Sequence, residues 1–203
     1  MVFCEQITEI LGLKTPTLPA EGWEQLELLD NLLNRWDKAS NLTGFTREET
    51  RCRRYFAEAL AAVPWVLAGG RAMDIGSGGG SPALPLAIAL PGVQWTLIES
   101  KERKAFFLEE AIEALALKNA TVVRGRYGEK GLFSARDTVT VRGVALNPEE
   151  LLQLLGELRP GGRLLWFNGR EQQRQFRDRY EGDCVGPKEL VKKGSSLLVV
   201  PRP

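Results

Sequence analysis

The sequence predicts an α/β protein with a mostly parallel sheet and helices on both of its faces. Two observations lead to this fold class. From residue 71 onward, short apolar runs alternate with helix-like segments, the pattern of strand–helix–strand units. Residues 1–65 show only helical periodicity, so we expect an N-terminal helical cap, 1–65, ahead of a sheet domain, 66–203. No linker-like stretch divides the two parts, and we expect them to pack as one body.

The helical cap contains two clear helical patterns. The first is an apolar stripe at helical spacing, formed by Trp23, Leu26, Leu29, Leu33 and Trp36. The second helix is expected over about 47–63, with Tyr55 on its apolar stripe and several arginines on its polar face. A polar break that contains a glycine, 40–44, separates the two helices.

The sheet domain is expected to follow in order along the chain. The predicted strands are 72–75, 93–98, 121–123, 138–141, 163–167 and 195–200. The predicted helices are 84–90, one around 108–115, 148–158 and 170–180, and 160–162 is expected to be a turn. Ligands of such sheets bind beyond the carboxyl ends of the strands. We therefore expect the loops after these strands to form one functional rim.

Composition limits the classes of protein. The chain has 203 residues, of which 43% are hydrophobic and 26% charged, as in globular proteins. No apolar run is long enough to cross a bilayer and the N-terminus lacks a signal sequence, so we expect a cytoplasmic protein without a membrane partner. Three scattered cysteines without any histidine argue against a disulfide framework and a metal site. We expect a monomer, and with a net charge of +1 any nucleic-acid affinity must come from local patches.

The absence of histidine also limits the chemistry. It excludes Ser-His and Cys-His nucleophilic catalysis and removes the commonest general base. The reaction must therefore proceed without an imidazole.

The stretch 74–80 is the most informative of the chain. Its glycines follow a predicted strand, which lets backbone amides approach a ligand closely. Glu99 ends the next strand, where a carboxylate suits the hydroxyls of a ribose. A dinucleotide fingerprint starting at Gly76 requires glycine at the position of Ser81. The form D-x-G-x-G-x-G, with Asp74 able to face an ammonium group, instead indicates S-adenosylmethionine (SAM), although glycines can also serve only to make a tight turn.

Several segments then resemble the RsmG (GidB) family, bacterial SAM-dependent enzymes that methylate guanine N7 in 16S ribosomal RNA. The residues 34–38 with 41–43 resemble the family's "YNK…NLT", 74–88 resemble "D-x-GSGAGFPGIPLAI", 97–100 resemble "LLDS", 101–108 resemble "KKR-x-x-FL", 117–126 resemble "LGLKNVTVVHGR", and 139–142 resemble "VTARA". Order and spacing hold from about residue 30 to 170. The resemblance implies a class I Rossmann-like SAM methyltransferase, with a mostly parallel seven-stranded-type sheet, that acts on 16S rRNA or the 30S subunit.

The chain also departs from the family pattern. The family's "HFLDS" corresponds to 55–59, which read YFAEA, and its "GFPG" corresponds to 80–83, which read GSPA. The family's "GRAE" corresponds to 125–128, "RA" to 142–143, and the "KG" after the fifth strand to 168–169, where this chain has GRYG, RG and NG. The cofactor half is largely kept, whereas the half expected to meet RNA is changed.

Methyl transfer to a ring nitrogen suits this chain, because the N7 lone pair is available without loss of a proton. The predicted cofactor contacts are Asp74, Gly76, Ser77, Gly78, Gly80, Glu99, Ser100, Arg126 and Tyr127. Arg142, at the end of the fourth strand, is the candidate for positioning the acceptor, through bidentate donors to a guanine edge or a phosphate. The candidate RNA contacts are Asn41, Arg51, Arg54 and Asn168.

Bland alternatives remain for several of these residues. Arg142 can be an ordinary surface arginine, and Arg126 can be a solvated loop residue. The arginines of 47–54 can simply form the solvent-exposed face of a helix. Tyr55 fits the core better than a base-stacking position. Three other functions also stay open: a degenerate SAM-binding protein that docks on RNA or the ribosome, a methyltransferase for a small molecule, and a dinucleotide-dependent oxidoreductase, against which Ser81 argues.

Overall fold

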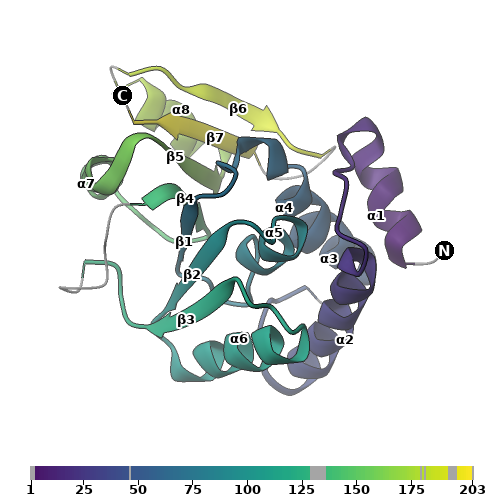
Figure 1. Ribbon diagram of the computed structural model, residues 1–203. Helices are drawn as coiled ribbons and strands as arrows, with labels where there is room; N and C mark the ends of the chain where they lie inside the picture. Colours follow the sequence, from purple (N-terminus) through teal and green to yellow (C-terminus); the bar gives the residue numbers. More distant parts are fainter. Residues whose placement is uncertain are drawn as a thin grey trace.

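The computed structural model describes residues 3–45, 47–128, 136–178, 180, 182–191 and 196–202 (Figure 1). The helical elements are α1 (Phe3–Leu11), η1 (Gly12–Lys14), α2 (Gly22–Ser40), α3 (Glu48–Arg51), η2 (Cys52–Ala57), α4 (Glu58–Leu60), η3 (Val63–Trp65), α5 (Ala83–Ala89), α6 (Glu102–Ala114), α7 (Pro148–Glu157) and α8 (Arg170–Arg177). The strands are β1 (Arg71–Ile75), β2 (Gln94–Glu99), β3 (Ala120–Arg124), β4 (Arg136–Arg142), β5 (Leu158–Asn168), β6 (Val185–Glu189) and β7 (Ser196–Pro201).

The strands form one seven-stranded sheet in the order β3-β2-β1-β4-β5-β7-β6. The pairs among β1 to β5 are parallel, and β7 runs antiparallel to both of its neighbours, β5 and β6. This topology confirms the predicted mostly parallel α/β sheet. Because β4 and β5 follow β1 on the side away from β2, the sheet reverses its direction of growth at β1, where ligands of such sheets bind.

Two parts of the sheet differ from the prediction. The expected turn at 160–162 lies inside β5, whose register against β4 shifts between Arg136 and Thr138. Gly161 and Gly162 also exchange backbone hydrogen bonds with Arg202, so these residues continue the strand as an irregular ribbon. The edge strand β6 was not predicted, because its sequence, VGPKE, lacks an apolar alternation; proline and charged residues are typical of strands at a sheet edge.

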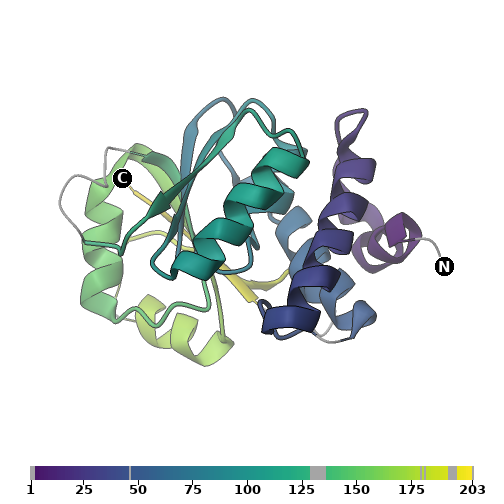
Figure 2. The same cartoon turned by 90° about the horizontal axis from the view of Figure 1, so that it is seen from below.

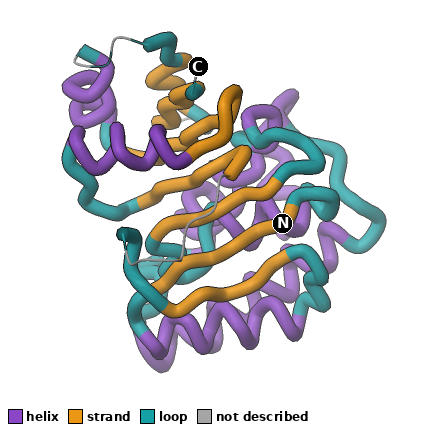
Figure 3. Tube along the Cα trace, turned by 60° about the vertical axis from the view of Figure 1, so that its left-hand side comes forward, coloured by secondary structure: helices purple, strands orange, loops and turns teal. Residues whose placement is uncertain are grey.

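Helices cover both faces of the sheet (Figures 2 and 3). On one face lie α5, α6 and α2, with α1 beyond α2; on the other lie α7 and α8. Alternation along each strand sends side chains to two separate cores. Ala72, Trp95 and Leu165 belong to the core under α2, α5 and α6, whereas Met73, Val139 and Trp166 belong to the core under α7 and α8. Among the described residues, no helix has both the length and the apolar character needed to cross a membrane.

The N-terminal helices share the first of these cores with the sheet. Ile7, Leu29 and Phe56 pack in one apolar cluster with Leu84 and Trp95. The helix predicted over 47–63 is present as consecutive pieces, α3, η2 and α4, and its central piece is a π-helix. Such segments often lie at functional sites, because the wider turn redirects the side chains that follow it. Here the Tyr55 side chain of the π-helix reaches the glycine turn after β1, where its hydroxyl donates to the Gly79 carbonyl.

Candidate cofactor and acceptor site

The glycine turn after β1 needs glycine for both conformation and space. Gly76, Gly78 and Gly80 have φ angles of 67°, 56° and 93°, which favour glycine. A Cβ on Gly76 would lie 2.4 Å from Val144 Cγ2, in the loop after β4. A Cβ on Gly80 would lie equally close, 2.4 Å, to Leu84 Cδ1. The turn is therefore closely packed between the loop after β4 and the first turn of α5.

Hydrogen bonds inside the turn fix its path. The Ser77 amide donates to the Ile98 carbonyl at 2.9 Å, and the Gly80 amide donates to the Ser77 carbonyl at 2.7 Å. The Ser77 hydroxyl donates to the Asp74 carbonyl at 3.2 Å and is buried. Ser77, one of the predicted cofactor contacts, thus shapes the turn in this structure.

Asp74 is buried at the end of β1 with one carboxylate oxygen left open. The Thr140 hydroxyl, opposite it on β4, donates to Asp74 Oδ1, whereas Asp74 Oδ2 has no hydrogen-bond partner among the described residues. Burial raises the pKa of Asp74 to about 6, partly offset by the hydrogen bond from Thr140. A buried acceptor without a donor is costly, and a cationic ammonium group satisfies it. This oxygen fits the ammonium end of SAM.

Glu99 is buried at the end of β2 and holds two backbone amides. Its Oε2 accepts from the Gly78 amide and its Oε1 from the Lys101 amide, both at 2.8 Å. The carboxylate thereby joins the glycine turn to the start of α6. Each oxygen keeps a second lone pair, so the geometry still fits the two hydroxyls of a ribose.

The remaining predicted cofactor contacts follow β2 and β3. Ser100 and Arg126 are exposed in the loops after these strands, and Tyr127 is half-buried. Burial raises the pKa of Tyr127 to about 12. These residues lie at the carboxyl edge of the sheet, where Ser100 directly follows Glu99 along the chain.

Arg142 does not lie free on the surface. Its Nη2 donates to Glu58 Oε2 at 2.7 Å and its Nη1 donates to Ser81 Oγ at 2.9 Å, while the guanidinium stands 5.9 Å from the Phe167 ring centroid. The side chain is 14% exposed and that of Glu58 is fully buried. Burial lowers the pKa of Arg142, and the charge of Glu58 opposes that shift. The guanidinium is thus held in a fixed orientation at the end of β4.

Three of the residues that depart from the family pattern meet around Arg142. Besides Glu58 and Ser81 these include Tyr55, whose hydroxyl donates to the Gly79 carbonyl at 2.7 Å. The Ser81 hydroxyl in turn donates to the Tyr55 carbonyl at 2.8 Å. Tyr55 is buried, as its place on the apolar stripe predicts, yet its hydroxyl binds the glycine turn. These departures therefore form one connected set of contacts that ties the helical cap to the rim.

The candidate RNA contacts are found in different surroundings. Asn41 is exposed and caps the end of α2 with a φ of 48°, and Arg54 and Asn168 are half-buried. Arg51 requires a correction, because it is buried and its Nε and Nη2 both donate to the Asp30 carboxylate. Such an arginine is not available to a phosphate; it instead joins α3 to α2, and desolvation opposes but does not cancel the rise in its pKa caused by Asp30.

Thr140 and Glu58 are site residues that sequence reasoning missed. Thr140 could have been found from β4 itself, since Thr138, Thr140 and Arg142 alternate with valines and therefore share a face. That face is the one on which Asp74 lies. Glu58 had no such signal, because its partner Arg142 is 84 residues away along the chain.

Comparison with known proteins shows the family of this chain. Residues 23–190 match the model of the GidB family, described as rRNA small subunit methyltransferase G. The chain belongs to this family. It is 33% identical over 168 residues to ribosomal RNA small subunit methyltransferase G of Coxiella burnetii, covering 82% of this chain and 80% of that protein. It is 38% identical over 160 residues to the protein of the same name from Xanthomonas campestris, covering 78% of this chain and 74% of the relative.

Solved structures show the same fold. An O-methyltransferase from Bacillus cereus in complex with SAH superposes with a TM-score of 0.66 at 18% identity, covering 96% of this chain and 94% of that one. A SAM-dependent methyltransferase from Aquifex aeolicus gives a TM-score of 0.63 at 15% identity, covering 80% and 96%. The fold is the Rossmann-like fold of SAM methyltransferases. The chain is a methyltransferase, and SAM is its expected cofactor.

Proposed function

We propose that this protein transfers a methyl group from SAM to N7 of a guanine in small-subunit ribosomal RNA. The observation that carries the proposal is the open oxygen of buried Asp74 beside the glycine turn, in a chain of the methyltransferase G family. The carboxyl ends of β1 and β2 carry the residues proposed to hold the cofactor, namely Asp74, the glycine turn and Glu99. The proposed place of action is the cytoplasm, where an rRNA acceptor would be met.

In the proposed reaction the protein aligns two reactants and does not exchange a proton. SAM supplies an electrophilic methyl on a sulfonium; the N7 lone pair forms the new bond to carbon as the carbon–sulfur bond breaks, and sulfur keeps the electron pair. Asp74 holds the ammonium group and Glu99 the ribose, which fixes where the methyl points. No general base is needed, which suits a chain without histidine.

Arg142 is the proposed acceptor-side residue. Glu58 and Ser81 engage one N–H on each terminal nitrogen, so the guanidinium keeps further donors in a fixed plane. A fixed donor plane suits the O6 edge of guanine beside the reacting N7. We assign the RNA contacts to Asn41, Arg54 and Asn168 and leave out Arg51. Ribosomal RNA, free or in the 30S subunit, is the proposed partner, and the working form is proposed to be a monomer without metal.

The rival proposal is a degenerate SAM-binding protein that docks on RNA without methyl transfer. The changes at Tyr55, Ala83, Gly128 and Asn168 motivate it. The hydrogen bonds that Tyr55, Glu58 and Ser81 make around Arg142 favour an active enzyme, because lost function leaves no reason for these residues to stay matched to one another.

The deciding experiment is transfer of labelled methyl from SAM to 30S subunits and to deproteinised 16S RNA from a strain without its own methyltransferase G. We expect label at a single guanine N7, lost in Asp74→Ala and Arg142→Ala. Intact SAM binding by calorimetry without any label would transfer the assignment to the degenerate binder or to another acceptor. A small-molecule acceptor is recognised by binding that does not weaken steeply with salt.

A further inference from the structure

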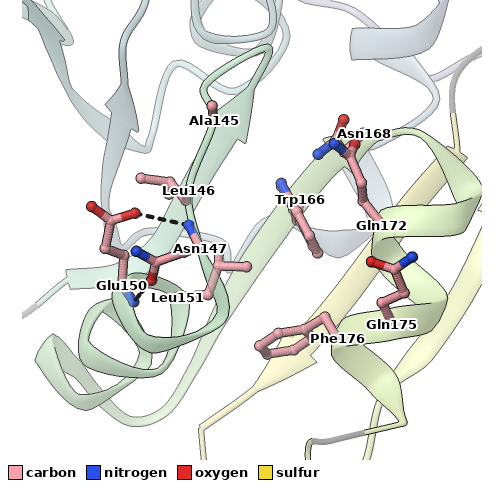
Figure 4. Close-up of a pocket in the computed structure, with 10 residues that line it drawn as sticks. All are labelled: Ala145, Leu146, Asn147, Glu150, Leu151, Trp166, Asn168, Gln172, Gln175 and Phe176. Carbon is pink, nitrogen blue, oxygen red and sulfur yellow. Dashed lines mark hydrogen bonds between the residues drawn. The ribbon is translucent and has the colours of Figure 1, made fainter.

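A pocket lies on the face of the sheet that α7 and α8 cover (Figure 4). Its volume is about 440 Å³, within the range of small-molecule sites. It is lined by Ala145, Leu146, Asn147, Glu150, Leu151, Trp166, Asn168, Gln172, Gln175 and Phe176. These residues come from the loop after β4, the start of α7, the end of β5 and α8, so the pocket opens at the same carboxyl edge as the cofactor site.

The pocket contains a hydrogen-bond donor without a partner. Trp166 is 3% exposed, and its Nε1 has no acceptor among the described residues. Figure 4 shows this nitrogen between the loop of Ala145 and Leu146 on one side and Asn168 on the other. Leu146 and Asn168 are only half-buried, so a ligand that displaces either side chain brings an acceptor to the indole N–H. An unsatisfied buried N–H destabilises the protein, and such an acceptor removes that cost.

Apart from Glu150, the other polar side chains of the pocket are neutral. Asn168, Gln172 and Gln175 present amides, while Leu151 and Phe176 supply apolar surface. Glu150 is the one charged residue among those that line it, and its carboxylate accepts from the Asn147 amide at 2.8 Å in a capping box. Amides beside an aromatic wall suit a flat, uncharged ring that both donates and accepts hydrogen bonds. They do not suit a phosphate or a charged peptide side chain.

The floor and one wall of the pocket are held in place by Gln173. This fully buried side chain donates from Nε2 to the Trp166 carbonyl at 2.7 Å and to the Ser196 carbonyl at 3.0 Å, which fastens α8 to β5 and β7. The Phe176 ring then meets the Trp166 indole edge-on, with 5.7 Å between the ring centroids. The aromatic wall of Trp166 and Phe176 is therefore in place before a ligand arrives, and only the half-buried Leu146 or Asn168 side chain has to move.

One loop connects the pocket with the cofactor turn. Val144 packs so closely on Gly76 that a Cβ there would lie 2.4 Å from Val144 Cγ2, and the next residue, Ala145, lines the pocket. Consecutive Cα atoms are about 3.8 Å apart, so the two sites are separated by little more than the width of this loop. An RNA strand whose target base lies at the cofactor turn can place a neighbouring base in the pocket.

We propose that this pocket binds an unpaired nucleobase of the RNA substrate, next to the methylated one, with a base acceptor taking the Trp166 indole N–H. The inference rests on the proposed function, because it names how the same acceptor strand is held. Bases of single-stranded RNA are commonly read in this way, by hydrogen bonds to their edges and by aromatic contact. Trp166 is thus assigned to recognition of the RNA, not to the methyl transfer itself.

The first test observes the indole directly and needs no activity. The five tryptophan Nε1–H signals of the ¹⁵N-labelled protein are followed while each of the four nucleosides is added to millimolar concentration, with Trp166→Phe used to assign its signal. We expect a shift of the Trp166 signal with at least one nucleoside. Trp95 is the matched internal control, because its Nε1 is also buried without a partner but lies in the other core. No shift, or equal shifts of both signals, overturns the proposal.

The second test separates the pocket from the proposed function. Methyl transfer to 30S subunits is measured for Trp166→Phe, for Trp95→Phe, and for Gln172→Ala, which changes an exposed residue should the tryptophan variant not fold. We expect KM for the RNA to rise about threefold to tenfold in Trp166→Phe, since one hydrogen bond contributes about 0.5–1.5 kcal/mol, with kcat and SAM affinity unchanged. Equal KM values for the two tryptophan variants overturn the proposal that the pocket binds a base of the RNA. Absence of any methyl transfer by the wild type overturns the proposed function, while the nucleoside titration still decides whether the pocket binds a base.

Discussion

The site at the carboxyl ends of β1 and β2, the cofactor edge, is built differently from the site at the carboxyl ends of β4 and β5, the acceptor edge. At the first edge the site is made by the chain's own turns: Glu99 holds the Gly78 and Lys101 amides, and Asp74 keeps an open oxygen. At the second edge Arg142 is oriented by Glu58, which arrives from the helical cap. The cofactor edge is therefore local, whereas the acceptor edge depends on tertiary contacts.

This difference accounts for three of the positions at which the chain departs from its family pattern. A local site tolerates few changes, because each glycine and carboxylate acts directly on the ligand. A site held by contacts between distant segments can change several residues together, provided that the hydrogen bonds are made again. Tyr55, Glu58 and Ser81 are such a set around Arg142.

The largest effect is expected from breaking the tie between the cap and the acceptor edge. Glu58→Ala leaves the buried guanidinium of Arg142 without its carboxylate, and removal of one partner of a buried ion pair costs about 3–5 kcal/mol. Urea unfolding of Glu58→Ala, Arg142→Ala and the double variant gives the coupling. We expect the double variant to lose clearly less free energy of unfolding than the sum of the single ones.

The matched control for this cycle is the exposed pair of Arg124 and Glu102, whose side chains are 61% and 77% exposed. Exposed ion pairs contribute about 0–1 kcal/mol, so the same three variants there should show almost no coupling. Additive losses at Glu58 and Arg142 would contradict an acceptor edge that is held by the cap.

The next effect tests the contact between the two edges. Gly76 and Gly143 have nearly the same φ, 67° and 65°, but only at Gly76 does an added Cβ meet another atom, Val144 Cγ2. Alanine at either position costs about 1–2 kcal/mol for the left-handed conformation. Gly76→Ala adds overpacking, for a total of about 2–4 kcal/mol. Thermal unfolding of the two variants measures the difference, and equal losses would show that the loop after β4 moves away without cost.

The same distinction decides what could be predicted from the sequence. Asp74, the glycines and Glu99 lie within one strand–turn–helix–strand unit, so their spacing alone indicated a SAM site. The orientation of Arg142 could not be predicted, because Glu58 and Ser81 meet it only in the folded chain. The burial of Arg51 could not be predicted for the same reason, since its partner Asp30 lies on another helix. The strand β6 lacked any periodic signal, because an edge strand need not alternate.

A smaller effect is expected from neutralising the open carboxylate of the cofactor edge. Asp74→Asn keeps the shape and the contact with Thr140 but removes the charge that faces an ammonium group. A hydrogen bond to a charged group contributes about 1.5–3 kcal/mol, so the Kd for SAM should rise roughly ten- to a hundredfold. Calorimetry measures it, and Asp183→Asn, a change at an exposed aspartate, is the control. An unchanged Kd would remove Asp74 from the cofactor site.

The smallest effect follows from the pKa of the same group. Burial raises the pKa of Asp74 from 3.8 to about 6, with Thr140 and Arg142 lowering it and Glu99 raising it. SAM binding requires the ionised form of Asp74, so the affinity for SAM should fall about tenfold per pH unit below about pH 6, a dependence that Asp74→Asn should abolish.

Without SAM, the stability of the protein should depend on the ionisation of Asp74 in the opposite direction. A raised acid pKa gives stability that is present below the unfolded value and is lost as the pH rises through about 6. Asp74→Asn should therefore unfold at higher urea than the wild type near pH 7 and lose this advantage near pH 4. These results would show that the ionised Asp74 carboxylate lowers the stability of the fold as long as no SAM is bound.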